Sequence, residues 1–225
     1  MLIPEGVLPE APESLTVNFV FPSPHPFSEG QFEEILRGMG SKLGRGSATS
    51  LLGAETEAIG GEYQGSLVLY TPQTGHLGFY KLKPESSIEL VQAIQGGLLA
   101  AAKLTQDDVR SVELDAVYLL DLRPTAMAAL REHRPGPKWL SELFNHELQE
   151  MGLRWASKEA TTWTDSYRTL TPWYQVLVEP FVDNPRKLFL RIIVREKNWE
   201  MLKPHLASLQ NRAATIFSEV VKHGD

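Results

Sequence analysis

Alternation of apolar and polar side chains is the sequence feature that most constrains how this chain can fold. Apolar residues stand at every second position from Leu15 to Phe21. Successive side chains of a strand point to opposite faces of a sheet, so this spacing predicts a half-buried β-strand. Residues 111–122 predict a longer strand, and residues 66–70 and 77–82 flank the turn sequence PQTGH and predict a hairpin. Three more strand candidates are LRWASKEATTW, YQVLVEPFV and KLFLRIIVR, the last two joined by DNP.

Apolar residues at three-to-four-residue spacing predict amphipathic helices among these strands. The predicted helices span residues 28–37, 86–103, 124–132, 139–151 and 198–222. Ser28 is placed to cap the first of them through its side-chain oxygen. Pro204 lacks a backbone N–H, so the last helix is expected to start later or to kink there.

The mixed order of strands and helices predicts an α+β fold. We expect a mostly antiparallel sheet built from hairpins, packed by amphipathic helices, with a long C-terminal helix. Three prolines among residues 1–14 predict an extended N-terminal arm. Residues 15–225 are then expected to form a single α+β domain, or two halves, about 15–110 and 111–225, that share one core.

Glycine is concentrated between residues 38 and 66, where eight of the residues are glycine. This density predicts a loop. The backbone amides of such a loop can hold a phosphate, but Glu55, Glu57 and Glu62 lie close by in the sequence and disfavour an anion there.

The absence of cysteine excludes several classes of protein. The chain can form no disulfide, zinc–thiolate site or iron–sulfur cluster and can use no thiol nucleophile. The N-terminus lacks the basic and apolar regions of a signal peptide, and the longest apolar run, LLAAAKL, is far shorter than the roughly 20 residues that cross a bilayer. We therefore predict a soluble, cytoplasmic protein with no cofactor and no membrane contact.

The net charge of −6 is distributed unevenly along the chain. Residues 1–112 hold 7 basic and 13 acidic side chains, whereas residues 113–225 hold 15 of each. An acidic surface disfavours nucleic acid, since binding there depends on neutralising phosphates. Only the second half therefore leaves nucleic-acid binding open.

Within that second half, one predicted strand carries a basic stripe. Lys187, Arg191 and Arg195 share one face of the strand with Phe189, whose ring could stack on a base. This pattern is typical of an anion or nucleic-acid contact. The alternative is that the cations pair with Glu179 or with the acidic face of another strand.

That acidic face belongs to the strand of residues 111–122. Glu113, Asp115 and Asp121 project to the same side of it, together with two apolar residues. Paired carboxylates can hold Mg²⁺ for phosphodiester hydrolysis, so one alternative function is a metal-dependent phosphodiesterase or nuclease. No further ligand is indicated by the sequence, and a solvated face of the sheet explains the pattern equally well.

Aromatic residues gather in the segment WTDSYRTLTPWYQ. Trp163, Tyr167, Trp173 and Tyr174 combine apolar rings with polar tips, which is typical of ligand pockets and partner interfaces. The alternative is that they belong to the core between sheet and helix. The apolar stripe of the C-terminal helix could likewise mediate self-association or pack on the sheet.

Three segments carry a resemblance to a known family. These are the early strand LTVNFVF, the strand VRSVELDAVYLLDL that follows a helix, and the closing helix LASLQNRAATIFSEVV. In their order the chain resembles a sporadically distributed bacterial and archaeal family of α+β proteins of similar length whose function is unknown. The resemblance implies a prokaryotic source and supplies no activity.

Taken together, these patterns predict a protein that acts by binding, without catalysis. Its partner is expected to be another protein, a second copy of the chain or a small ligand. The two alternatives are the metal-dependent phosphodiesterase or nuclease and a nucleic-acid-binding component that uses the basic strand 187–195.

Overall fold

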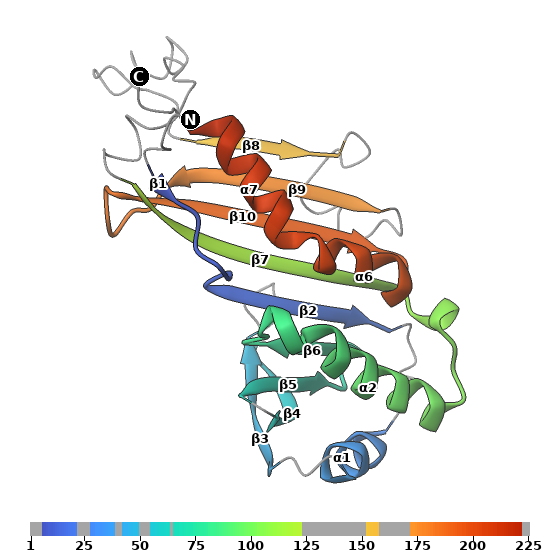
Figure 1. Ribbon diagram of the computed structural model, residues 1–225. Coiled ribbons are helices and arrows are strands. Elements are labelled where there is room, and N and C mark those ends of the chain that lie inside the picture. The colour runs from blue at the N-terminus through green and yellow to red at the C-terminus, as the bar shows by residue number, and fades with distance from the viewer. Residues whose placement is uncertain are drawn as a thin grey trace, which may run out of the picture.

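Strands from both ends of the chain join in one sheet (Figure 1). The computed structural model describes residues 6–21, 28–38, 42–49, 55–63, 65–122, 152–157 and 172–221. Within these ranges ten strands form the sheet, in the order β3-β4-β5-β6-β2-β7-β10-β9-β8, with β1 paired to β7. The strands are β1 Gly6–Val7, β2 Ser14–Val20, β3 Lys42–Thr49, β4 Glu55–Tyr63, β5 Ser66–Thr71, β6 His76–Tyr80, β7 Ser111–Leu122, β8 Leu153–Ala156, β9 Trp173–Pro180 and β10 Lys187–Glu196.

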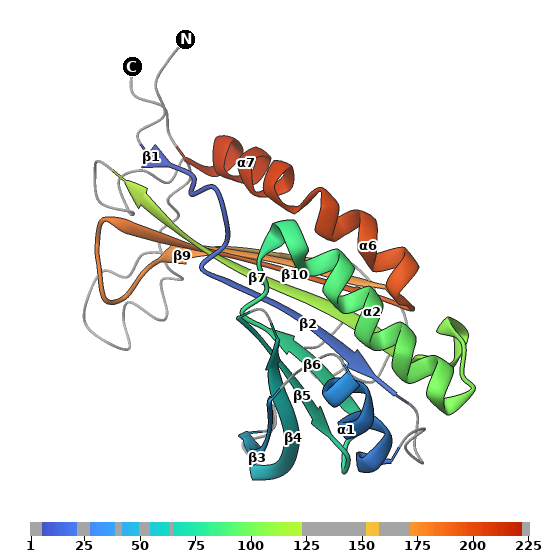
Figure 2. The same ribbon diagram turned by 60° about the horizontal axis from the view of Figure 1, so that its bottom comes forward.

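Neighbouring strands pair antiparallel throughout this order. The helices are α1 Glu29–Gly38, α2 Pro84–Ala102, α6 Trp199–Ala207 and α7 Leu209–Val220, with a short 3-10 turn at Gln106–Asp108. Figure 2 shows α2, α6 and α7 side by side over one face of the sheet. The predicted α+β class and mostly antiparallel sheet are therefore confirmed.

Alternate residues of β2 and β7 are buried, as the alternating sequence pattern predicts. Leu15, Val17 and Phe19 of β2 are buried, and so is every second residue of β7 from Val112 to Leu122. The intervening side chains are mostly partly exposed. These two strands therefore present one apolar face to the helices and one mixed face to the other side of the sheet.

Residues from before and after residue 111 share one hydrophobic core. The ring of Phe19 lies 5.9 Å from that of Phe79 and 6.1 Å from that of Trp199, measured between centroids. Both ends of the chain also meet at Gln210, whose Nε2 donates to the Pro9 carbonyl at 2.7 Å and whose Oε1 accepts from the Tyr118 hydroxyl at 3.1 Å. The β2–β6 unit and the C-terminal helices are thus packed together.

The N-terminal arm is partly incorporated into the sheet. Gly6 and Val7 pair with Leu122 and Asp121 of β7. The predicted helices at 124–132 and 139–151 lie outside the described residues, as does the part of the LRWASKEATTW strand after residue 157. None of the described helices is long and apolar enough to span a membrane.

The first predicted helix has the expected start. The Ser28 hydroxyl oxygen accepts from the Gln31 amide at 3.3 Å, and the Gln31 side chain accepts from the Ser28 amide at 2.8 Å. This reciprocal pair is a capping box, which satisfies two backbone donors that the first turn of the helix leaves free. Phe32 and Leu36 then face the core.

The single long C-terminal helix is not confirmed, because the chain forms α6 and α7 with a break at Ser208. Pro204 lies inside α6 and cannot donate a backbone hydrogen bond. The Ser208 hydroxyl donates to the Pro204 carbonyl at 2.8 Å, a bond that bends helices. The apolar stripe continues across the break, and Leu202, Leu209 and Ala213 pack into the core of the same chain. That stripe is therefore occupied by the chain's own sheet.

The predicted loop at 38–66 is wrong, because residues 42–49 and 55–63 form β3 and β4, which contain four of the eight glycines. Gly44 pairs with Gly60, and Gly60 pairs on its other side with Leu69 of β5. A Cβ on Gly60 would lie 2.3 Å from Leu69 Cδ2 and 2.4 Å from the Val68 carbonyl oxygen. Gly60 therefore allows close approach between strands, whereas Gly65, with a φ of 83°, lies in the turn before β5. Glycine density alone does not distinguish these two uses.

Candidate binding groove

The acidic and basic stripes predicted as separate sites lie side by side on the sheet. Antiparallel pairing of β7 and β10 places Arg195 opposite Glu113 and Lys187 opposite Asp121. Arg195 Nη2 lies 2.5 Å from Glu113 Oε2, and Lys187 Nζ lies 3.6 Å from Asp121 Oδ1. Arg191 binds both carboxylate oxygens of Asp115, at 3.0 and 2.6 Å. Each member of one stripe is thus paired with a member of the other.

The innermost pair is closed off from water. The side chains of Arg195 and Glu113 are 5% and 14% exposed. Burial raises the pKa of Glu113, and the adjacent Arg195 opposes that rise. On its other side, Arg195 faces Trp173, with its guanidinium carbon 5.6 Å from the ring centroid. These contacts favour a structural role for this cross-strand cluster.

Because of this pairing, the charges of the basic stripe are neutralised by those of the acidic stripe. A phosphate approaching Arg191 would have to displace a bidentate carboxylate, and a metal ion approaching Asp115 would have to displace a guanidinium. Within the described ranges, no group of three or more His, Asp or Glu side chains is arranged to hold a metal ion. This geometry supports neither the nuclease alternative nor the nucleic-acid alternative.

The predicted aromatic cluster is only partly within the described structure. Trp163 and Tyr167 lie outside it. Trp173 and Tyr174 are neighbours in β9 and therefore project to opposite faces of the sheet. Trp173 is buried beside Arg195, whereas Tyr174 is 37% exposed on the face that carries α7. Of these two residues, only Tyr174 reaches an open site.

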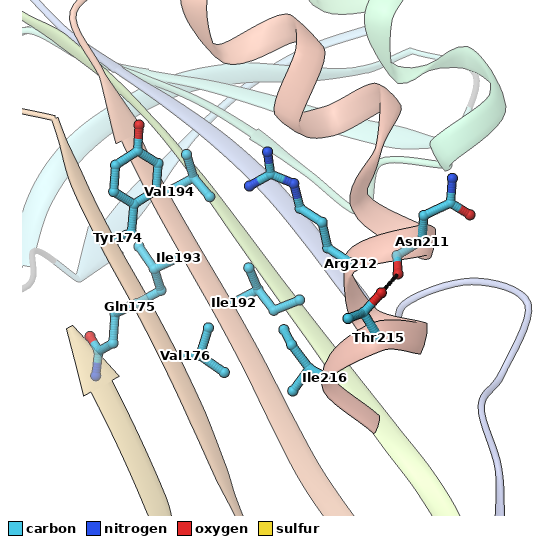
Figure 3. Close-up of a pocket in the computed structure, with 10 residues that line it drawn as sticks. All are labelled: Tyr174, Gln175, Val176, Ile192, Ile193, Val194, Asn211, Arg212, Thr215 and Ile216. Carbon is cyan, nitrogen blue, oxygen red and sulfur yellow. Dashed lines mark hydrogen bonds between the residues drawn. The ribbon is translucent and has the colours of Figure 1, made fainter. Parts of the chain in front are cut away.

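That site is a groove between α7 and strands β9 and β10, with a cavity volume of about 390 Å³ (Figure 3). Val176, Ile192 and Val194 come from the sheet and Ile216 from α7. The complete lining is Tyr174, Gln175, Val176, Ile192, Ile193, Val194, Asn211, Arg212, Thr215 and Ile216. On α7, Leu209, Ala213 and Phe217 form one stripe, which is buried in the core. Arg212 and Ile216 form the neighbouring stripe of the helix, and this stripe lines the groove together with residues of β9 and β10.

One end of the groove is bordered by a polar network around Glu196. The Tyr174 hydroxyl donates to Glu196 Oε1 at 2.5 Å, and His205 Nε2 lies 3.1 Å from the same oxygen. The His205 and Tyr174 rings are 5.6 Å apart. The network therefore joins β9, β10 and α6 and fixes the Tyr174 ring in the wall of the groove.

The protonation states of this network follow from its surroundings. Burial, followed by the nearby positive charge of Arg212, lowers the pKa of His205. The hydrogen bond to Glu196 is the main cause that raises the pKa of Tyr174 to about 12. At neutral pH we therefore expect a neutral imidazole and a protonated phenol, each bonded to one carboxylate.

Arg212 is the cation that lines the groove. Its Nε donates to Ser208 Oγ at 3.1 Å. Among the residues that the structure describes, its terminal nitrogens have no hydrogen-bond or ion-pair partner. Figure 3 shows the guanidinium reaching from α7 toward β10, on the Tyr174 side of the groove. Within the described part of the chain, these nitrogens are therefore available to an anion.

Comparisons with family models, curated proteins and solved structures find no match. The resemblance to the bacterial and archaeal family therefore stays a prediction. Sequence reasoning identified Tyr174 but missed Arg212, Glu196 and His205. Only the regular spacing of Arg212 and Ile216 beside the buried stripe of the last helix could have indicated the groove from the sequence.

The His205 network predicts a pH dependence of folding stability. The pKa of His205 is lowered from 6.5 in the folded protein, so the unfolded chain takes up this proton first as the pH falls. Above pH 6.5, His205 therefore makes its full contribution to the free energy of unfolding. This contribution is lost as the pH falls from 6.5 through the lower pKa of His205 in the folded protein. His76, whose pKa burial also lowers, acts in the same direction.

Urea unfolding at about pH 7.5 and about pH 5.5 measures this effect, since the unperturbed histidine pKa lies between them. Between these two pH values, the free energy of unfolding of the His205→Gln variant is expected to fall less than that of the wild type. The His205→Gln/His76→Gln double variant should lose less again. An unchanged pH dependence in His205→Gln would contradict the assignment.

Proposed function

We propose that the protein is a non-catalytic binding protein that holds a small ligand in the groove between α7 and strands β9 and β10. The observation that carries this proposal is the groove itself, with an apolar floor, a few polar groups along its rim and a volume of about 390 Å³. Small-molecule sites have this composition and this range of size.

The apolar surface continues beyond the groove. Trp155 of β8 is opposite Val176 in the register of β8 and β9, so both side chains project to the face that carries α7. Trp155 is 47% exposed. An apolar ligand longer than the groove could extend along this face, and aromatic side chains are frequent in such contacts.

The charged groups also support binding over catalysis. Glu113, Asp115 and Asp121 are engaged by cations of β10, and Glu196 is engaged by Tyr174 and His205. These groups hold structural elements together, and catalysis by any of these four carboxylates would require it to exchange its partner for a substrate. The groove can bind a ligand with all of these contacts intact.

Fluorescence of N-phenyl-1-naphthylamine, a neutral apolar probe, tests the groove. We expect saturable binding to the wild type and at least about tenfold weaker binding to Ile216→Trp, because the larger ring occupies space that the probe needs. Circular dichroism of each variant checks that the fold is retained.

Met201→Trp is the matched control, since it adds the same ring at an exposed apolar position of α6 outside the groove lining. Its affinity for the probe should equal that of the wild type. The proposal fails if the probe does not bind, or if Ile216→Trp and Met201→Trp bind it equally well.

A further inference from the structure

We propose that the ligand of the groove is an amphipathic carboxylate, whose head group pairs with Arg212 and whose apolar part lies over Val176, Ile192 and Ile216. This inference rests on the proposed function and adds to it the chemical class of the ligand. It comes from the combination of one free guanidinium with an apolar floor in the same groove.

The break between α6 and α7 orients Arg212 for this role. Ser208 Oγ donates to the carbonyls of Pro204 and His205, at 2.8 and 3.3 Å, and accepts from Arg212 Nε at 3.1 Å. The inner nitrogen of the guanidinium is therefore held by the helix break, while the two outer nitrogens have no partner among the described residues. A guanidinium held in this way can offer its outer nitrogens to the two oxygens of a carboxylate.

Glu196, the carboxylate at the end of the groove, does not neutralise Arg212. Glu196 Oε1 accepts from Tyr174 and lies at hydrogen-bond distance from His205, and Glu196 forms no ion pair with Arg212 within the described structure. The positive charge of Arg212 nevertheless acts at this end of the groove, where it adds to the lowering of the His205 pKa by burial and partly opposes the rise of the Tyr174 pKa. A ligand anion beside Arg212 would meet that positive potential.

Charge balance favours a monoanion. Among the described residues that line the groove, Arg212 is the one cation, and Glu196 lies at the end of the groove. A carboxylate brings a single charge that one guanidinium can match. A phosphate monoester carries close to two negative charges at neutral pH and would leave an excess beside Glu196, whereas an alkyl ammonium would be repelled by Arg212.

The test compares ligands that share one apolar chain and differ in head group. Decanoate, decanol, decylamine and decyl phosphate are each titrated by calorimetry and by displacement of N-phenyl-1-naphthylamine. Decanoate is expected to bind at least about tenfold more tightly than the other three. Within a series of carboxylates, affinity should rise about threefold to fourfold for each added methylene until the apolar floor is covered.

Variants of Arg212 separate this inference from the proposed function. Arg212→Gln should weaken decanoate about tenfold and weaken decanol and the neutral probe much less, and Arg212→Lys should retain part of the decanoate affinity. Arg186→Gln is the control, because it removes one exposed positive charge from the β9–β10 turn, outside the groove lining.

The outcomes are distinct for the two proposals. Binding of the neutral probe with equal affinities for decanoate and decanol would overturn the carboxylate assignment and leave the groove as a binding site. Tighter binding of decyl phosphate, or loss of decanoate affinity in Arg186→Gln equal to that in Arg212→Gln, would also overturn it. Absence of binding by both probe and decanoate would overturn both proposals.

Discussion

Replacing Glu113 with alanine is expected to lower the free energy of unfolding by about 3 kcal/mol, because it removes the carboxylate of a buried ion pair. The Arg195 side chain is only 5% exposed, so water cannot take the place of the lost carboxylate without disturbing the sheet. The measurement is urea denaturation followed by tryptophan fluorescence and circular dichroism.

Asp121→Ala is the matched control on the same face of the same strand. Asp121 is 75% exposed and lies 3.6 Å from Lys187, so its ion pair is hydrated and its loss should change stability by less than about 1 kcal/mol. The double variant Glu113→Leu/Arg195→Met removes both buried charges and should be more stable than Glu113→Ala. Equal effects of Glu113→Ala and Asp121→Ala would contradict the structural role of the pair.

Replacing Gly60 with alanine is expected to destabilise the protein by about 3 kcal/mol, since overpacking a close strand contact forces the backbone to move. The added methyl group would meet the Val68 carbonyl oxygen, a backbone atom, at 2.4 Å. Rotation of a side chain can relieve the contact with Leu69 but not the contact with that carbonyl. Chemical denaturation again measures the change.

Gly96→Ala is the opposite case within the same chain. Gly96 lies in α2, and a Cβ there meets no atom within 4 Å. Alanine should therefore stabilise the helix by about 0.5–1 kcal/mol. A Gly60→Ala variant as stable as the wild type would contradict the close strand contact, and destabilisation by Gly96→Ala would contradict the open space at that helical position.

Much of the secondary structure was predictable from local patterns. Leu15 to Phe21 and residues 111–122 alternate clearly enough to identify β2 and β7, and Ser28 and Gln31 mark the start of α1. In each case the physical cause acts within a few residues: the two faces of a strand, or the free amides at the start of a helix.

The glycine-rich hairpin and the break at Ser208 show where local patterns fail. A run of glycines has the same composition whether it forms a loop or a close strand contact, and β5 alone distinguishes the two at Gly60. Pro204 was recognised as a point of strain, but the break falls four residues later, where Ser208 bonds to its carbonyl. The apolar spacing continues through the break and conceals it.

The candidate site was predictable only in part. Tyr174 was identified from its aromatic neighbourhood, but its neighbour Trp173 belongs to the opposite face of β9 and to a different environment. Arg212 has no distinguishing feature in the sequence, because it is one of three lysine and arginine residues on a predicted amphipathic helix. Its significance depends on what surrounds it in space.

The sequence by itself determined the fold class, the alternation of the long strands and the presence of an acidic and a basic stripe in its second half. Only the tertiary structure decided that these stripes neutralise each other, because Glu113 and Arg195 are 82 residues apart and meet through the register of β7 and β10. The groove is decided in the same way. It depends on how α7 packs back on β9 and β10 after α6, and its cation is defined by the absence of a partner among the described residues. Propensity and periodicity act over a few residues, whereas pairing, burial and cavities depend on which distant segments come together.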